Sequence, residues 1–234
     1  MGSIKLPHAS GNSMSIAAPA TNPASDLELK LPATIGTAGQ YLRNSSTAGT
    51  LEFGALPTDA NDYVKLQTVT GGSTINDITV DSLNTTTYRA FQLIGGIIPG
   101  VDGAHLKFYW RVDGTDQTAS SYDFGLMYSF PTDDHYSFSE NGQSNLTILE
   151  NAGNAAREGH RFNILMFPYV SGHASQTGNF LTWQGMRVDQ NHNFRSVAGT
   201  GLYDEDNIYP NGFKLVTSSG QMNDYNYSLY GIKA

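Results

Sequence analysis

The stretch His-Leu-Lys-Phe-Tyr-Trp-Arg-Val, residues 105–112, alternates polar and apolar side chains over eight positions. Successive side chains of a β-strand point to opposite faces, so this alternation predicts one apolar face and one polar face. Phe108 and Trp110 lie at the centre of the apolar face, whereas Lys107 and Arg111 lie on the other. The stretch therefore predicts a half-buried strand with Trp110 in the core.

Similar short apolar runs recur through residues 55–234. Residues 124–130 repeat the alternation, and Phe162–Phe167 is almost continuously apolar, as expected for a strand buried on both faces. The further candidate strands are Tyr63–Val69, Ile75–Val80, Tyr88–Ile98, Asn145–Leu149, Phe180–Val188, Phe213–Thr217 and Tyr225–Ile232. About ten strands separated by turn signals predict an all-β fold, an antiparallel, jelly-roll-like β-sandwich. The best candidate for a short helix is Ala152–Gly159.

The composition excludes several classes of protein and site. Only 15% of the residues are charged and the formal net charge is −8, which disfavours binding to nucleic-acid phosphates. The absence of cysteine excludes disulfides and thiolate metal sites. No apolar run is long enough for a transmembrane helix, and the first residues lack the apolar region of a signal peptide. We therefore expect a protein assembled in a cytoplasm, with no nucleic-acid partner and no membrane insertion.

Residues 1–54 differ in composition from residues 55–234. The first region holds two of the aromatic residues and its charges cancel, so the whole negative charge lies in the second region. Alternating stretches at Ser3–Leu6 and Leu27–Leu31 each have one apolar face that so small a segment cannot bury alone. Association of three copies would bury these faces. We therefore expect residues 1–54 to be an extended segment for trimerisation and attachment, with a disordered tail as the alternative.

Two parts of the chain resemble proteins of tailed bacteriophages. Leu31–Leu42, which reads Leu-Pro-Ala-Thr-Ile-Gly-Thr-Ala-Gly-Gln-Tyr-Leu, and the following Gly49–Phe53 are similar to a segment common in phage tail-fibre and related virion proteins. The remainder is similar to a β-domain of marine phage particle proteins in the stretches Ile98–Ala104, Ser120–Asp123, Asn151–Ala156, Thr182–Gln184, Ser218–Gly220 and Leu229–Lys233. The resemblance implies a trimer that attaches to a host or particle surface, and not an enzyme.

This resemblance also sets the expected function and partners. We expect a virion structural protein, a short homotrimeric fibre that docks on capsid or tail proteins through residues 1–54. Its β-sandwich heads, residues 55–234, would contact a host-surface glycan or protein. No shaft precedes the head, which begins near Leu56, so a long receptor-reaching fibre is not expected. A capsid decoration protein and a polysaccharide depolymerase are the alternatives.

The search for catalytic motifs gives no candidate of a known class, so we expect no catalytic residue and no cofactor. The six histidines show no ligand spacing. A glycosidase would need two neighbouring carboxylates, and the pairs available are Glu150 with Glu158 and Asp133 with Asp134. Solvated turns account for both pairs more simply.

Two kinds of binding site remain as candidates. Asp204, Glu205 and Asp206 concentrate oxygen ligands of the type that Ca²⁺ prefers, although the spacing is not that of an EF-hand. An exposed acidic loop is the alternative. Tyr122 and Tyr136 are candidates for contact with a receptor, because tyrosine combines a flat apolar ring with a polar end. Packing in the core or between copies is the alternative for these two rings.

Overall fold

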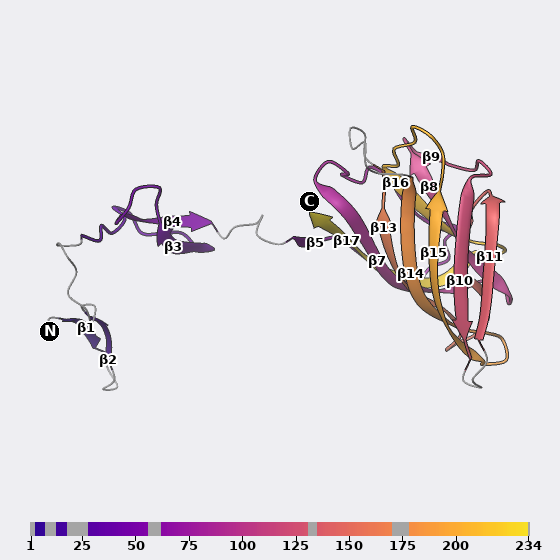
Figure 1. Ribbon diagram of the computed structural model, residues 1–234. Helices are drawn as coiled ribbons and strands as arrows, with labels where there is room; N and C mark the ends of the chain where they lie inside the picture. Colours follow the sequence, from indigo (N-terminus) through magenta and orange to yellow (C-terminus); the bar gives the residue numbers. More distant parts are fainter. Residues whose placement is uncertain are drawn as a thin grey trace. The chain divides into compact units, whose positions relative to one another are not determined.

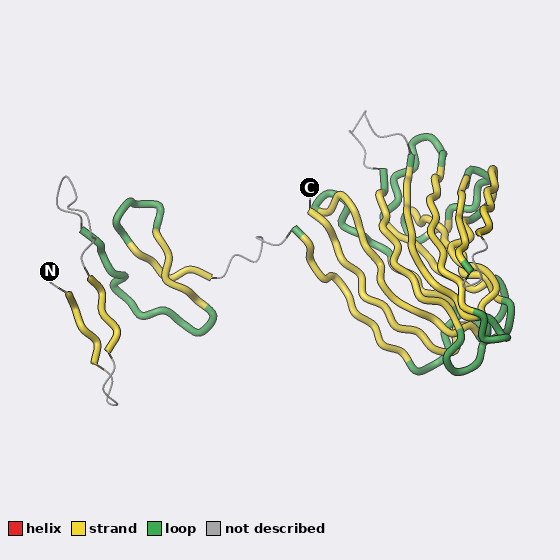
Figure 2. The backbone as a smooth tube through the Cα atoms, turned by 60° about the horizontal axis from the view of Figure 1, so that its bottom comes forward, coloured by secondary structure: helices red, strands yellow, loops and turns green. Residues whose placement is uncertain are grey.

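A computed structural model describes residues 3–7, 13–17, 28–55, 62–130, 135–169 and 178–233, with side chains from residue 28 onward. The chain divides into two units, residues 1–60 and residues 61–234, and each is described by itself. All regular elements in these ranges are β-strands, drawn as arrows in Figure 1 and in yellow in Figure 2. The described residues accordingly contain no helix that could cross a membrane.

The described residues of the first unit form two antiparallel strand pairs. Strand β1 (Ser3–Pro7) pairs with β2 (Ser13–Ala17), and β3 (Gln40–Asn44) pairs with β4 (Leu51–Ala55). An ion pair joins the cross-strand neighbours Arg43 and Glu52 at 2.9 Å. The strand predicted over Ser3–Leu6 is confirmed. The described part of Leu27–Leu31 forms only a single bridge, between Lys30 and Thr50, so the strand predicted there is wrong.

The second unit contains an eight-stranded antiparallel sheet, called the larger sheet. Its strand order is β11-β10-β15-β14-β13-β7-β17-β5. In chain order its strands are β5 (Tyr63–Gly71), β7 (Tyr88–Pro99), β10 (Tyr122–Ser129), β11 (His135–Gln143), β13 (Gly159–Phe167), β14 (Asn179–Val188), β15 (Phe194–Tyr203) and β17 (Met222–Lys233). The last strand of the chain thus lies inside the sheet, between β5 and β7.

A smaller sheet packs against one face of the larger sheet. Its order is β12-β8-β16-β6, and the short β9 pairs with β8. The strands are β6 (Asp77–Val80), β8 (Ala104–Val112), β9 (Thr115–Asp116), β12 (Leu146–Ala152) and β16 (Gly212–Thr217). Figure 1 is drawn from the side of the larger sheet, with β8 and β16 behind it. The two layers form a β-sandwich, and the predicted all-β antiparallel fold is confirmed.

Eight of the strands pass back and forth between the two sheets along the chain, except that β8 and β12 are consecutive members of the smaller sheet. Numbered in chain order, β5, β6, β7, β8, β12, β13, β16 and β17 take the order 1-8-3-6 in the larger sheet and 2-7-4-5 in the smaller one. First and last strands are therefore neighbours in one layer, and second and seventh in the other, an order typical of jelly rolls. The hairpins β10–β11 and β14–β15 widen the larger sheet beyond this set.

The core lies between the two sheets and is rich in aromatic rings. Trp110 is completely buried, and its ring meets that of Phe108 edge-on with the centroids 5.0 Å apart. Leu106 is also buried, so the inward face predicted for β8 is confirmed. The indole Nε1 of Trp110 has no hydrogen-bond partner among the described residues.

Glycines on the inner face of the larger sheet make room for large side chains. Gly199 lies beside Trp183 in the β14–β15 pair, and the buried indole covers the position where a Cβ atom would stand. Gly201 makes room in the same way for Leu146 of the smaller sheet, because a Cβ added at Gly201 would lie 2.8 Å from the Leu146 side chain. Larger residues at these positions would push the sheets apart, so the glycines allow the close packing of the layers.

The remaining sequence predictions have mixed outcomes. The helix predicted over Ala152–Gly159 is wrong, because β12 ends at Ala152 and a turn leads into β13. Strand β13 is buried on one face only: Ile164 and Met166 are buried, whereas Phe167 is 38% exposed. Strands β11 and β15 were not predicted.

Candidate functional site: a groove on the larger sheet

The outer face of the larger sheet, which does not contact the smaller sheet, carries a groove. Its volume is about 1050 Å³, and its lining residues come from seven adjacent strands, from β5 across to β10. A second hollow of about 520 Å³ adjoins it and shares the lining residues Met127, Asn163, Gln184 and Ala198. The two hollows therefore form one elongated depression, which we call the outer groove.

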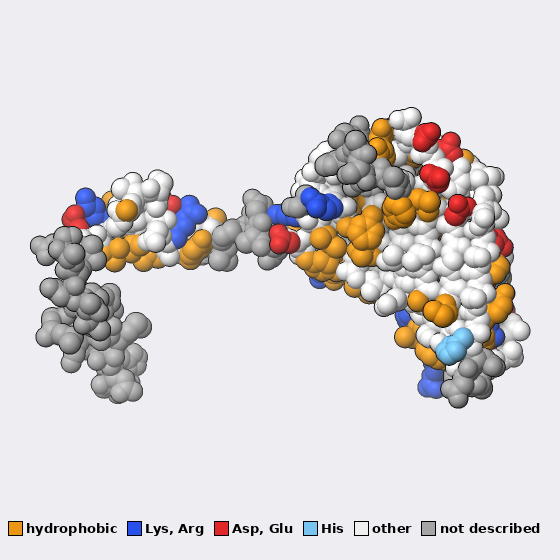
Figure 3. All heavy atoms as spheres, in the orientation of Figure 1, with side chains coloured by type: hydrophobic (Ala, Val, Ile, Leu, Met, Phe, Trp, Pro, Cys, Tyr) orange, Lys and Arg blue, Asp and Glu red, His pale blue; other side chains and the backbone are white. Residues whose placement is uncertain are grey.

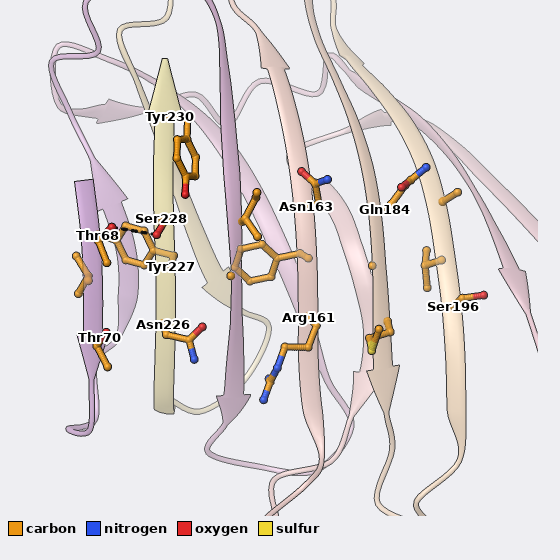
Figure 4. Close-up of a pocket in the computed structure, with 18 of the residues that line it drawn as sticks. Thr68, Thr70, Arg161, Asn163, Gln184, Ser196, Asn226, Tyr227, Ser228 and Tyr230 are labelled. Atoms are coloured by element: carbon orange, nitrogen blue, oxygen red, sulfur yellow. Dashed lines mark hydrogen bonds between the residues drawn. The ribbon is translucent and has the colours of Figure 1, made fainter. Parts of the chain in front are cut away.

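The outer groove is lined mainly by uncharged polar side chains. These point outward because they occupy alternate positions on strands whose other positions face the core. Figure 4 shows several of them on one side of the sheet, including Asn163 and Gln184. The outward-facing hydroxyl and amide side chains of the main hollow are Thr68, Thr70, Ser129, Asn163, Gln184, Ser196, Asn226 and Ser228. Their groups supply many hydrogen-bond donors and acceptors and no formal charge.

Among the described residues, Arg161 is the one charged residue that lines either hollow. Its side chain lies along the bare backbone of the cross-strand neighbour Gly96, where a Cβ would stand 2.7 Å from Nη1. Nη1 donates a hydrogen bond to the carbonyl oxygen of His160 at 2.9 Å. Among the described residues no carboxylate lies within 4.0 Å of the guanidinium nitrogens of Arg161. The groove thus presents a positioned cation without an internal counter-ion.

A chain of hydrogen bonds fixes polar groups at one side of the groove. The hydroxyl of Tyr63 donates to Oε1 of Gln92 at 2.5 Å, and Nε2 of Gln92 donates to Oδ1 of Asn163 at 2.6 Å. This arrangement leaves the NH₂ group of Asn163 free to donate into the groove. The ring of Tyr63 stacks on Tyr230 with the centroids 4.7 Å apart, and burial together with the neighbouring Tyr230 raises the pKa of Tyr63.

Exposed apolar side chains are unusually common on this face. Ile94, Met127 and Met186 line the groove and are 42%, 55% and 44% exposed. The cross-strand pair Phe167 and Phe180 is also partly exposed on the same face. Figure 3 shows this side of the head: its centre is white and orange, and the red acidic side chains gather along one rim. Apolar area of this kind marks interaction surfaces.

The two tyrosines predicted as receptor contacts differ in their exposure to solvent. Tyr122 is fully buried; its hydroxyl accepts a hydrogen bond from the backbone N of Trp110 and donates one to the carbonyl oxygen of Gln117, both at 2.9 Å. Burial raises the pKa of Tyr122. A ring with no exposed surface does not meet a receptor, so the prediction for Tyr122 is wrong. Tyr136 is 52% exposed on the edge strand β11 and does not line the outer groove; its receptor role stays a prediction.

The acidic loop after β15 lacks the geometry of a cation site. Asp204, Glu205 and Asp206 are exposed, and Glu205 accepts a hydrogen bond from the hydroxyl of Ser121 at 2.6 Å. Within the described ranges no group of three or more His, Asp or Glu side chains converges as metal ligands would. The three carboxylates of this loop are not gathered as ligands of one ion, which counts against the calcium site expected here.

The carboxylate pair Glu150 and Glu158, considered for hydrolysis, does not line the groove. Glu150 accepts a hydrogen bond from the hydroxyl of Tyr128 at 2.7 Å, and Glu158 accepts one from the backbone N of Ala155 at 2.8 Å. Asp133 and Asp134 lie outside the described residues. Glycoside hydrolysis requires two carboxylates beside the substrate, and the described residues that line the groove include none. The outer groove is suited to binding rather than to this reaction.

Searches against protein families, curated proteins and solved structures found no match to this chain.

Proposed function

We propose that the chain is a non-enzymatic structural protein of a tailed bacteriophage particle. In this proposal three copies associate and dock on capsid or tail proteins through residues 1–54, and the β-sandwich heads face outward to attach to a host or another surface. Three heads on one base increase the overall binding strength, because each further contact forms at a high effective concentration.

The observation that carries this proposal is the exposure of apolar side chains in the first unit. Leu29, Leu31, Ile35 and Leu42 are 62%, 73%, 93% and 46% exposed. Among the described residues of this unit, no further strands form a layer that covers these side chains. Burial of apolar area is the main driving force for association, so contacts with further copies and with a particle protein would stabilise this unit.

The oligomeric state of the full chain tests the proposal. Sedimentation equilibrium at micromolar concentration should give three times the chain mass of 25.3 kDa. Replacing Leu31 and Ile35 together by Ser should shift the equilibrium toward the monomer. Val101→Ser is the matched control, because Val101 is a 37% exposed apolar residue of the head. A monomeric wild-type chain, or equal behaviour of both variants, would contradict the proposed association.

Deletion of residues 1–54 tests the division of labour between the two units. The truncated chain keeps the complete sandwich core, so its far-ultraviolet circular dichroism should remain that of a folded β-protein. Its incorporation into particles should be lost, whereas the full chain should be incorporated. A folded, truncated head that still enters particles would refute the docking role of residues 1–54.

A further inference from the structure

We propose that the outer groove binds an oligosaccharide, and that Arg161 holds a carboxylate of an acidic sugar in that oligosaccharide. The inference rests on the proposed attachment function for its biological role, and it names the class of ligand that the head would recognise. Three features of the groove point to this ligand: its length, its mostly uncharged lining and the guanidinium group of Arg161 within it.

The length of the groove indicates an elongated ligand. Its lining runs across seven adjacent strands, from Thr68 on β5 to Met127 on β10. Neighbouring strands lie about 4.8 Å apart, so six gaps correspond to roughly 29 Å along the sheet. A chain of several linked sugars fits such a depression, whereas a single small metabolite would leave most of it empty.

The lining matches the surface of a sugar. Sugar rings carry hydroxyl groups at their edges and apolar C–H groups on their faces. Gln184, Ser196 and Asn226 offer amide and hydroxyl groups with no hydrogen-bond partner among the described residues. Ile94 and Met186 supply exposed apolar surface between them. A nucleic acid is disfavoured because the chain has a net charge of −8 and the described lining of the groove has one cation.

Arg161 defines the charged contact. The side chain is held along Gly96 and at the carbonyl of His160, which leaves its remaining N–H donors available. A guanidinium group binds a carboxylate through two parallel hydrogen bonds, and such bonds are stronger than neutral ones. In an acidic chain, a cation without an internal carboxylate partner is complementary to an external anion.

The shape of the groove favours this ligand over a second copy of the chain. Two identical concave faces placed against each other would enclose an empty space, and protein interfaces pack without such voids. A slender ligand that lies in the depression fills it and contacts the side chains on both walls.

Binding of the full chain to an array of immobilised oligosaccharides tests the inference. The array should carry neutral oligosaccharides, uronate-containing and sialate-containing ones, sulfated ones, and the methyl esters of the uronates, in which the charge is removed and the sugar chain is kept. We expect retention of carboxylate-bearing oligosaccharides and about tenfold weaker retention of their methyl esters, which corresponds to the loss of about 1.4 kcal/mol when a charge-assisted hydrogen bond is removed.

Three variants assign the binding to the groove. Arg161→Gln should lower affinity for the uronate about tenfold and leave affinity for its ester unchanged. Gln184→Ala should weaken both. Arg89→Gln, which removes an exposed cation of β7 outside the groove lining, should change neither.

Several outcomes would overturn the inference. These are no retained oligosaccharide, retention of neutral or sulfated ones alone, or equal effects of Arg161→Gln and Arg89→Gln. A trimeric chain that retains no sugar would reject the groove assignment and leave the proposed fibre intact. A monomeric chain that binds uronates through Arg161 would reject the fibre and leave the groove assignment intact.

Discussion

Replacement of Gly199 by Ala tests the close packing of the two sheets. Gly199 lies on β15 beside Trp183 of β14, and Trp183 is 2% exposed. A methyl group at position 199 would overlap the indole ring, 2.8 Å from Nε1 and closer still to two ring carbons. The ring is rigid and buried in the core, so a shift of the ring requires its neighbours to move as well.

The expected cost follows from this overlap. Ordinary contacts between carbon atoms are 3.5–4.0 Å, so the indole must move by about an ångström or the strands must separate. Insertion of a methyl group into a well-packed core typically costs 1–3 kcal/mol, and the completely enclosed ring places Gly199→Ala at the upper end, about 3 kcal/mol. Ala in place of Gly also restricts the unfolded chain, which offsets roughly 0.4–1 kcal/mol of this cost.

Gly125→Ala is the matched control, because it introduces the same methyl group on the neighbouring strand β10. The nearest atom to a Cβ at Gly125 is the carbonyl oxygen of Phe138, at 3.9 Å. The free energy of unfolding of this variant should therefore equal or slightly exceed that of the wild type. Guanidinium unfolding followed by circular dichroism measures both free energies, and tryptophan emission reports the environment of Trp183. Free energies of unfolding that agree within about 0.5 kcal/mol for the two variants would refute the packing argument.

Two further predictions concern buried polar groups. Burial lowers the pKa of His160 to about 3, below its value of about 6.5 in the unfolded chain, so the stability due to the neutral ring is complete above pH 6.5 and declines as the pH falls toward 3. The free energy of unfolding measured with urea should fall by about 3 kcal/mol between pH 6.5 and pH 4 because of this group. His160→Gln should remove this part of the pH dependence. Parallel pH profiles for the wild type and the variant would contradict the role given to His160. Tyr122→Phe leaves the buried backbone N–H of Trp110 without its partner and should lower the free energy of unfolding by about 1–3 kcal/mol, measured by thermal or urea unfolding. Tyr136→Phe on the exposed edge strand should leave the free energy of unfolding unchanged. Equal losses in the two variants would show that the hydroxyl of Tyr122 has no structural role.

The fold was largely predictable because most strands follow a strict alternation. Strand β15 was missed for a physical reason: Gly199 and Gly201 on its inner face leave space for Trp183 and Leu146, and glycines in a sequence normally indicate a break in a strand. Strand β11 was missed because it is an edge strand with a polar composition. In both strands tertiary packing, rather than local propensity, determines the structure.

The error at Tyr122 could have been avoided from the sequence. Tyr122 is in phase with Phe124, Leu126 and Tyr128, and all four side chains are buried on one face of β10. The outer groove, in contrast, was not predictable. In the sequence, its polar residues look the same as those on any solvent-exposed face of a strand. They come together only because strands that are far apart in the chain, such as β5 and β17, are neighbours in the sheet.

The interior position of β17 has a consequence for how the head forms during synthesis. Strands β5 and β7 are made early, yet each pairs with β17, which spans residues 222–233. Pairing between segments so distant in sequence is slow, because a long loop must close before any contact is gained. The larger sheet therefore remains divided, with two open strand edges, until residues 222–233 leave the ribosome. Chains interrupted before this strand expose edges that invite aggregation, which makes the synthesis of β17 the step that commits the head to its native state.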